Sequence, residues 1–172
     1  MPTTEPVTEL DARYSEPDAT AAAWGEARET LAAAEVFWLT TVRPDGRPHV
    51  TPLLSVLLDD VPVFTTGAQE RKARNLAANP RVVLTTGTNA LSHGLDITVE
   101  GTARRVRDQA VLTRVAEAYT EKYGSDWTFT ARDGALHHAE GGAALAFEVA
   151  PDTAFGFRKG AYSQTRWRFP AR

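Results

Sequence analysis

The sequence of 172 residues contains no cysteine. This absence excludes disulfide bonds and thiol catalysis, and it leaves only histidine and carboxylate side chains as metal ligands. No apolar run approaches the length that crosses a membrane, and the acidic residues near the N-terminus do not form a signal peptide. We therefore expect a cytoplasmic protein with no membrane partner.

Charge and missing motifs exclude several further classes of protein. The net charge of −3 gives no general attraction to nucleic acid. The patterns G-x-G-x-x-G of dinucleotide-binding sheets, H-E-x-x-H of zinc hydrolases and G-x-S-x-G of serine hydrolases are absent. His49, His93 and the pair His137-His138 lack the spacing of a metal site. We expect neither a nucleic-acid partner nor a bound metal.

Strand patterns dominate what is present. Residues 18–172 suffice for one domain, whereas residues 1–17, rich in Pro, Thr and acids, predict a flexible tail or an arm that lies on a partner. β-branched and aromatic residues predict a meander over 37–65, strands at 81–86 and 95–106, and closing strands at 144–149, 154–157 and 165–169. Gly101 indicates a bulge in the long strand.

Three helices are predicted between these strands. They cover about 19–34 with Asp18 as the cap, about 69–78, and 109–123 between the cap Asp108 and the terminating Gly124. Residues 125–142 follow no pattern that assigns them to an element. The order of elements predicts a mainly β, α+β fold, namely an antiparallel barrel of six or seven strands with helices at its corners.

The end of the meander is the first candidate site. Thr65-Thr66-Gly67 leads into a helix that carries Arg71, Lys72 and Arg74 near its start. The free N–H groups of a helix start favour an anion, and cations alone at that end are unfavourable. The pattern therefore predicts a phosphate cradle, although three cations on a short helix are also typical of a solvated face.

Two other segments are candidate ligand surfaces. The segment His49-Val50-Thr51-Pro52-Leu53 has a proline inside a strand, which indicates either an edge that can contact a flat heterocycle or an edge that proline merely protects. The segment Arg166-Trp167-Arg168 places two arginines on one strand face, which suits an anionic ligand or a surface ion pair. The residues alone leave both choices open.

Two motifs make the chain recognisable. Phe37 begins F-W-L-T-T-V-R-P-D-G-R-P-H-V-T-P-L, and Val63 begins V-F-T-T-G-A-Q-E-R-K-A-R-N-L-A-A-N-P-R-V. With these motifs the chain resembles the pyridoxamine 5′-phosphate oxidase-like superfamily over about Trp24 to Phe169. The resemblance implies a six- to seven-stranded split β-barrel that forms a homodimer, with two cofactor sites in clefts between the subunits.

The resemblance also implies which residues hold the cofactor, which is FMN or, alternatively, the deazaflavin coenzyme F420. They are Val50, Thr51 and Pro52 beside the ring, Thr65 and Thr66 at the ribityl chain and phosphate, Arg71, Lys72 and Asn75 at the phosphate, and Arg166, Trp167 and Arg168 from the partner subunit.

The expected activity follows from the resemblance and from one departure. True pyridoxamine phosphate oxidases have basic residues on the second strand, where this chain is uncharged from Thr51 to Val56. We therefore expect an oxidoreductase that transfers a hydride to or from another small substrate, with the chemistry supplied by the cofactor ring and no catalytic side chain assigned. The alternative is a non-catalytic protein that binds flavin, deazaflavin or heme.

Overall fold

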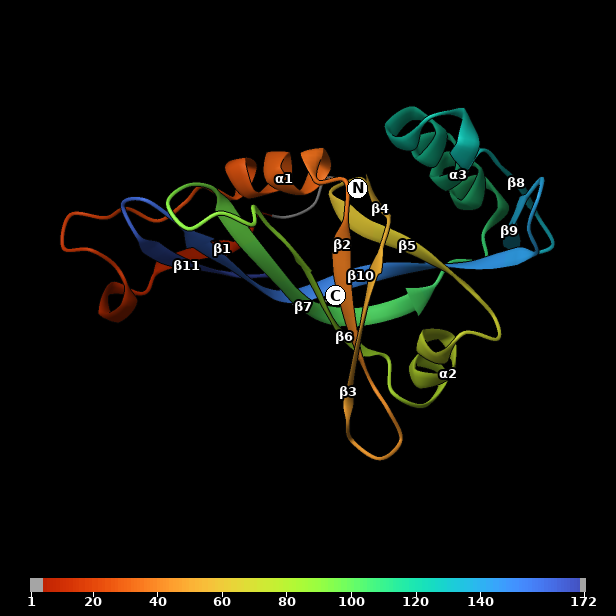
Figure 1. Cartoon of the computed structure of the whole chain (residues 1–172), viewed down its shortest axis with the longest axis horizontal. Helices are drawn as coiled ribbons and strands as arrows, with labels where there is room; N and C mark the ends of the chain where they lie inside the picture. Colours follow the sequence, from red (N-terminus) through yellow and green to blue (C-terminus); the bar gives the residue numbers. More distant parts are fainter. Residues whose placement is uncertain (1–4, 171–172) are drawn as a thin grey trace.

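A strand of 16 residues, β10 (Ala143–Arg158), runs through the sheet and connects its two ends (Figure 1). The computed structural model describes residues 5–170. Along one edge β10 pairs with β7 (Leu95–Arg105); along the other it pairs first with β5 (Val61–Gly67) and later with β11 (Ser163–Arg168). The sheet therefore divides beside β10.

The remaining strands extend this sheet. On one side the order continues from β7 through β6 (Arg81–Thr86) and β2 (Phe37–Val42) to β3 (Pro48–Leu53), and β1 (Val7–Leu10) pairs with β11. The short strands are β4 (Ser55–Leu58), β8 (Phe129–Arg132) and β9 (Ala135–His138). The prediction of a mainly antiparallel fold with flanking helices is confirmed. The open sheet has eleven strands rather than six or seven.

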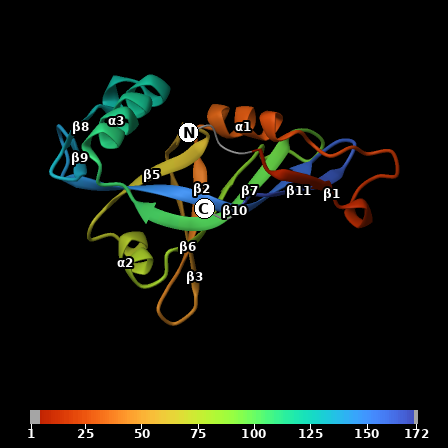
Figure 2. The ribbon, with the colours of Figure 1, turned by 180° about the vertical axis from the view of Figure 1, so that it is seen from behind.

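Helices flank the sheet at both ends. Seen from behind, α3 (Gln109–Tyr123) lies with β8 and β9 at one end, and α1 (Trp24–Ala33) lies toward the other (Figure 2). The third helix, α2 (Arg71–Ala78), follows β5; the 3₁₀ turns are η1 (Ala12–Tyr14) and η2 (Ser125–Trp127). No helix within residues 5–170 combines the length and the apolar character that a membrane crossing requires.

Two apolar clusters correspond to these two ends. Beneath α1, the buried side chains include Trp24, Leu31, Phe37 and Trp167. Beneath α3, they include Leu112, Val115, Tyr119, Val63 and Leu136. The predicted caps of α3 are confirmed, because the Asp108 carboxylate accepts a hydrogen bond from the Val111 N–H at 3.0 Å and Gly124 has a φ of 86°.

The closing strands differ from the prediction. Residues 144–149 and 154–157 belong to the single strand β10, whose register against β7 shifts between Pro151 and Thr153. Pro151-Asp152 therefore forms a bulge and not a turn. The bulge that Gly101 indicates lies in β10 and not in the strand of Gly101 itself; Gly101 is opposite it, and a Cβ there would lie only 2.3 Å from the Ala150 carbonyl oxygen. The close approach of the two backbones requires glycine at this position.

The meander predicted over 37–65 also differs from a simple three-strand arrangement, because its residues 50–58 do not form one strand and the chain changes partners at Leu54. Its first part is β3, which pairs with β2, and its second part is β4, which pairs with β5. The change of partner directs β3 away from the sheet toward α2, where it forms a projecting hairpin with β2 (Figure 1).

The N-terminal segment differs as well. Residues 1–4 of the predicted tail or arm lie outside the described residues, and Val7–Leu10 pairs with β11 of its own chain. The first helix begins at Trp24 and not near Asp18, and its N-cap Ala23 provides no side-chain hydrogen bond. The preceding Ala22 instead bonds to β11: its N–H donates to Thr165 Oγ1 at 2.9 Å, and its carbonyl accepts from Trp167 Nε1 at 3.2 Å.

Candidate cofactor-binding site

The turn between β5 and α2 gathers hydrogen-bond donors around a carboxylate. The Gly67 N–H donates to Glu70 Oε1 at 2.8 Å, and the Lys72 ammonium pairs with Glu70 Oε2. The Glu70 N–H returns a bond to the Gly67 carbonyl at 3.0 Å, so the turn is closed on itself just before α2 begins. The predicted cradle therefore holds an oxyanion, which its own chain supplies.

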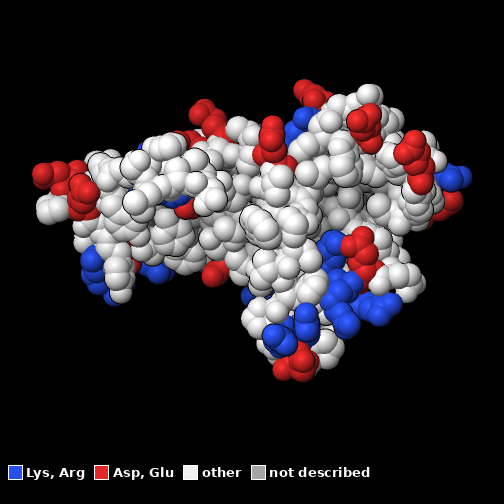
Figure 3. Space-filling model, viewed as in Figure 1, with Lys and Arg blue, Asp and Glu red and all other residues white. Residues whose placement is uncertain are grey.

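Electrostatics support this assignment. Burial raises the pKa of Glu70, but hydrogen bonds from the Lys72 ammonium, the Gly67 N–H and the Thr66 hydroxyl together hold it below the usual value. The Lys72 side chain is only 12% exposed, whereas Arg71 and Arg74 are exposed. Figure 3 shows Lys and Arg side chains gathered over the region of β3 and α2. The cradle thus stabilises negative charge.

A cavity of about 680 Å³ opens beside the cradle. Thr65, Thr66, Gly67, Glu70 and Lys72 line one side of it. Its other walls are mostly apolar. They come from the junction of β3 and β4, from the segment between α3 and β10, and from the start of β10. Their residues are Leu53, Leu54, Asp126, Trp127, Phe129, His138, Gly141 and Ala144. The cavity therefore combines an anion-binding side with an aromatic wall.

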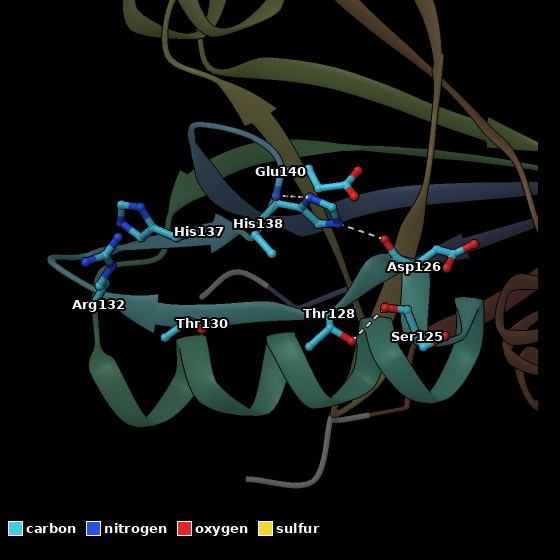
Figure 4. Close-up of a pocket in the computed structure, with 9 residues that line it drawn as sticks. Ser125, Asp126, Thr128, Thr130, Arg132, His137, His138 and Glu140 are labelled. Atoms are coloured by element: carbon cyan, nitrogen blue, oxygen red, sulfur yellow. Dashed lines mark hydrogen bonds between the residues drawn. The ribbon is translucent and has the colours of Figure 1, made fainter.

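His138 is part of this wall, and both nitrogens of its imidazole ring are hydrogen-bonded within the chain. Its Nδ1 accepts from the Glu140 N–H at 3.2 Å, which places the ring proton on Nε2, and Nε2 lies 2.8 Å from the Asp126 carbonyl oxygen (Figure 4). The ring stacks edge-on against Phe129, with 5.6 Å between the ring centroids. Because both nitrogens are bonded within the chain, His138 presents its ring as a surface and not as a ligand.

A second cavity of about 550 Å³ lies beside the same hairpin and shares His138 and Asp126 with the first. Figure 4 shows Thr130, Arg132 and His137 directed to one side of the β8–β9 hairpin. The Nε2 atom of His137 is buried and has no hydrogen-bond partner among the described residues. The second cavity is accordingly more polar than the first.

The face of β3 that is turned toward α2 carries buried polar atoms. Asn75 of α2 is 1% exposed, and its Nδ2 donates to Thr41 Oγ1 at 2.9 Å, but its Oδ1 has no partner among the described residues. The same holds for Arg43 Nε, His49 Nδ1 and Thr51 Oγ1. Unpaired buried polar atoms of this kind mark sites for water or a ligand.

His49 is in a positively charged environment. Burial lowers its pKa, and the positive charges of Arg43, Arg71 and Lys72 lower it further. The positive charges of α2 and of the β2–β3 hairpin therefore lie close enough together to act on the same side chain, His49. An anionic cofactor fits this region, because it would supply an acceptor for the unpaired Arg43 Nε and negative charge for the surrounding cations.

The structure separates the predicted site residues of β3 into two sets. Thr51 lies on the face toward α2, whereas Val50, with 53% of its surface exposed, and Pro52 lie on the opposite face beside Trp38. Thr65, Thr66, Arg71, Lys72 and Asn75 do lie together around the turn and α2.

The closing strand lies far from the cradle within one chain. Thr66 pairs with Leu145 of β10, and Arg166 pairs with Phe155, ten residues further along the same strand. At about 3.3 Å per residue this separation is about 33 Å. Arg166 and Arg168 form ion pairs with Glu9 of β1 instead. A single chain therefore does not bring these arginines to the cradle.

Trp167 also differs from its predicted role. Its ring is fully buried, lies edge-on to Trp24 at 5.4 Å between the ring centroids, and bonds to the Ala22 carbonyl. The alternation of β11 places Arg166 and Arg168 outside and Trp167 inside, so this ring packs in the core of its own chain. It offers no surface to a ligand.

Sequence reasoning missed the aromatic wall. No sequence pattern assigns residues 125–142 to an element, yet Trp127 lies there in η2, Phe129 in β8 and His138 in β9. The available signal was Asp133-Gly134, since both residues adopt positive φ, 53° and 66°, in a two-residue turn. Within residues 5–170, no three His, Asp or Glu side chains lie together as a metal site would require.

Comparisons with known proteins are consistent with this architecture. The chain is similar in structure to the conserved hypothetical protein Rv2991 from Mycobacterium tuberculosis, with a TM-score of 0.68 at 20% identity over 84% of this chain and 89% of the other. It is also similar to HutZ, a heme storage protein from Vibrio cholerae, with a TM-score of 0.62 at 24% identity over 79% and 94% of the two chains.

A third similar structure is the FAD binding protein from Mycobacterium smegmatis, with a TM-score of 0.54 at 20% identity over 84% of this chain and 94% of the other. These identities are low, so the likeness establishes the fold alone. A search of curated proteins gave no match. The family model for pyridoxamine 5′-phosphate oxidase matches residues 23–155, and the chain therefore belongs to the pyridoxamine 5′-phosphate oxidase family.

Proposed function

We propose that the protein is an oxidoreductase that binds FMN or, alternatively, the deazaflavin coenzyme F420, and that transfers a hydride to or from a small substrate. The observation that carries this proposal is the first cavity, in which the cradle donors and an aromatic wall line one space of about 680 Å³. A flavin or deazaflavin has the matching chemistry, since it joins a phosphate to a flat ring through a flexible chain.

Each part of the cavity has a role in this proposal. The Gly67 N–H, Lys72 and Arg71 would hold the phosphate, and Thr65 and Thr66 would contact the ribityl chain. A bound flavin or deazaflavin supplies the hydride-transfer chemistry. The protein contributes anchoring, orientation and exclusion of water.

The apolar residues of the cavity would face the ring. Leu53 and Trp127 line the cavity, and His138, with both nitrogens bonded, adds a surface that offers no free donor or acceptor nitrogen. A flat ring that rests against these residues is shielded from water on one side. The substrate would therefore approach from the opposite, open side.

A second copy of the chain completes the proposed site. Trp38 and Val50 are 50% and 53% exposed on one face of the β2–β3 hairpin, and Pro52 lies directly opposite Trp38 in the register. An apolar face of this kind is typical of an interface. We infer a homodimer in which this face is the interface, Val50, Thr51 and Pro52 of one copy contact the ring largely through their backbone, and Arg166 and Arg168 come from the other copy.

The test is cofactor binding by the purified protein, followed for FMN by flavin fluorescence and for F420 by absorbance. The double variant Arg71→Ala with Lys72→Ala should bind the cofactor more weakly, because each lost charge-assisted contact costs about 1.5–3 kcal/mol. Lys72 should account for most of this loss, since its side chain is the less exposed of the two.

Arg74→Ala is the matched control, because it removes a cation from the same helix that the proposal does not place at the phosphate. It should leave affinity nearly unchanged. Equal losses of cofactor affinity in the control and in the double variant would show that only the overall charge of the helix matters. Failure of the unaltered protein to bind either cofactor at micromolar concentration would refute the proposal.

A non-catalytic binding protein is the second candidate. The buried Nε2 of His137 has no partner among the described residues and is an available iron ligand, and the similar HutZ is a heme storage protein. Heme addition should then give a Soret band that His137→Ala removes. A flavin-loaded protein that is reduced and reoxidised through repeated turnovers with a panel of electron acceptors would instead support the oxidoreductase.

A further inference from the structure

Glu70 is the acidic group that occupies the cradle. Its two carboxylate oxygens accept bonds from different donors, Oε1 from the Gly67 N–H at 2.8 Å and Oε2 from Lys72. A Cβ at position 67 would lie 3.1 Å from Oε1, which is closer than ordinary van der Waals contact. Glycine at this position thus permits the close approach of the carboxylate to the backbone.

The Gly67 N–H is a single donor and cannot serve Glu70 and an acidic ligand at the same time, whereas the three N–H groups of Lys72 can bond to either anion. A phosphate bound to Lys72 and the Gly67 N–H would also bring a second negative charge next to the carboxylate, and like charges at this distance repel. The two anions therefore exclude each other. Binding of one requires departure of the other.

Departure of Glu70 is sterically simple. Its side chain is 51% exposed, so the carboxylate can rotate into water without disturbing the core. Lys72, at 12% exposure, stays in the cavity wall. The cradle can accordingly exchange its internal anion for an external one while its cation and its backbone donor remain in place.

We propose that Glu70 is an internal anion that every acidic ligand must displace from the cradle. This proposal rests on the proposed function, because it assumes that the cradle binds the phosphate of a cofactor. A monovalent carboxylate gains little by replacing Glu70, whereas a divalent phosphate brings more charge and a third acceptor oxygen. The site therefore selects phosphate esters over carboxylic acids.

The size of the effect follows from the occupancy of the cradle. The apparent dissociation constant equals the intrinsic constant divided by the fraction of molecules in which the cradle is free. If Glu70 leaves the cradle in about one molecule in ten to one in a hundred, its removal tightens phosphate binding about 10- to 100-fold. We take a tenfold gain as the threshold.

The experiment compares the unaltered protein with Glu70→Gln and Glu70→Ala. Glu70→Gln keeps the size of the side chain and an oxygen for the Gly67 N–H, and it removes only the charge. Inorganic phosphate is titrated while the amide resonance of Gly67 is followed by NMR, and FMN is titrated by fluorescence. Glu140→Gln is the control, since it removes the same charge from the wall of the second cavity.

We expect both Glu70 variants to bind inorganic phosphate at least tenfold more tightly, and Glu140→Gln to change affinity less than twofold. Acetate affinity should increase by the same factor, because the free fraction of the cradle scales the apparent dissociation constant of every anion equally. Unchanged or weaker phosphate binding in Glu70→Gln would overturn the proposal and leave Glu70 as a residue that only holds the turn.

The two proposals fail in different ways. If phosphate binding tightens in the Glu70 variants but no form of the protein binds FMN or F420, the role of Glu70 is supported and the cofactor proposal is refuted. If FMN binds to the unaltered protein and to Glu70→Gln with equal affinity, the role of Glu70 is refuted and the cofactor proposal stands.

Discussion

Replacement of Trp167 by alanine tests the assignment of this residue to the core. The ring is fully buried against Trp24, its N–H bonds to the Ala22 carbonyl, and Gly156 lies so close that a Cβ there would be 2.4 Å from the ring. These contacts join β11 and β10 to the segment that leads into α1. We therefore expect Trp167→Ala to reduce stability and not to act at the ligand.

The magnitude follows from the buried area and from the hydrogen bond. A buried tryptophan removes about 200 Å² from water, which is worth about 5 kcal/mol at about 25 cal/mol per Å². Because alanine retains part of this burial, we expect a loss of about 4 kcal/mol, within the range for such truncations. Trp167→Phe keeps most of the apolar contact and leaves the Ala22 carbonyl unpaired, for a loss of about 1–3 kcal/mol.

Urea unfolding followed by far-ultraviolet circular dichroism measures these losses without relying on tryptophan emission. A loss of about 4 kcal/mol lowers the melting temperature of a chain of this size by about 8–16 °C. Trp127→Ala is the matched variant, because Trp127 is 41% exposed in the wall of the first cavity. It should cost less than about 1 kcal/mol and should weaken cofactor binding. If Trp167→Ala instead retained stability and lost the cofactor, the structural assignment would be refuted.

Three further predictions concern the proposed dimer, the pH dependence of stability and the packing of α3. If the proposed dimer forms, Val50→Glu should convert it to a monomer in light scattering, whereas Val7→Glu on the exposed side of β1 should not. Burial lowers the pKa of Lys122 to about 8, from an ordinary value of 10.5. Between these two pH values the unfolded chain binds one more proton than the folded chain, so the free energy of unfolding should rise with pH. Lys122→Met should abolish this rise. Tyr123→Phe should cost about 1–3 kcal/mol in urea unfolding, because its hydroxyl bonds to the N–H and the carbonyl of Ser55.

Local signals were sufficient for much of the fold. The turn of the β2–β3 hairpin has Gly46 at a φ of 81°, as its Pro-Asp-Gly sequence predicts, and the cap and the terminating glycine of α3 are both in place. In each case the interaction that determines the element lies within a few residues of it. The turn before α2 depends on local interactions for the same reason, because Gly67, Glu70 and Lys72 are neighbours in sequence, and phosphate binding there stays a prediction.

Features that depend on distant partners were not predictable. Pro151-Asp152 has the composition of a turn, yet β7 continues opposite it on both sides and makes it a bulge. The alternation of β11 predicts that Trp167 points away from its two arginines, but not that Ala22 and Trp24 cover it. The wall of the cavity depends on where a hairpin from residues 125–142 packs, and that is determined by α3 and β10.

The position of the cavity follows from the way in which β10 exchanges partners. Ala144, near the start of this strand, lies opposite Gly67 of β5 and opposite Leu136 of β9, so one residue connects the cradle strand to the hairpin that carries the aromatic wall. Ala144 itself lines the cavity. Its small side chain leaves room between two walls that the same strand holds in register. The division of the sheet beside β10 therefore creates the first cavity. On one edge of β10, β5 ends in the cradle, and on the other edge the β8–β9 hairpin begins. The methyl group of Ala144 bounds the space between them.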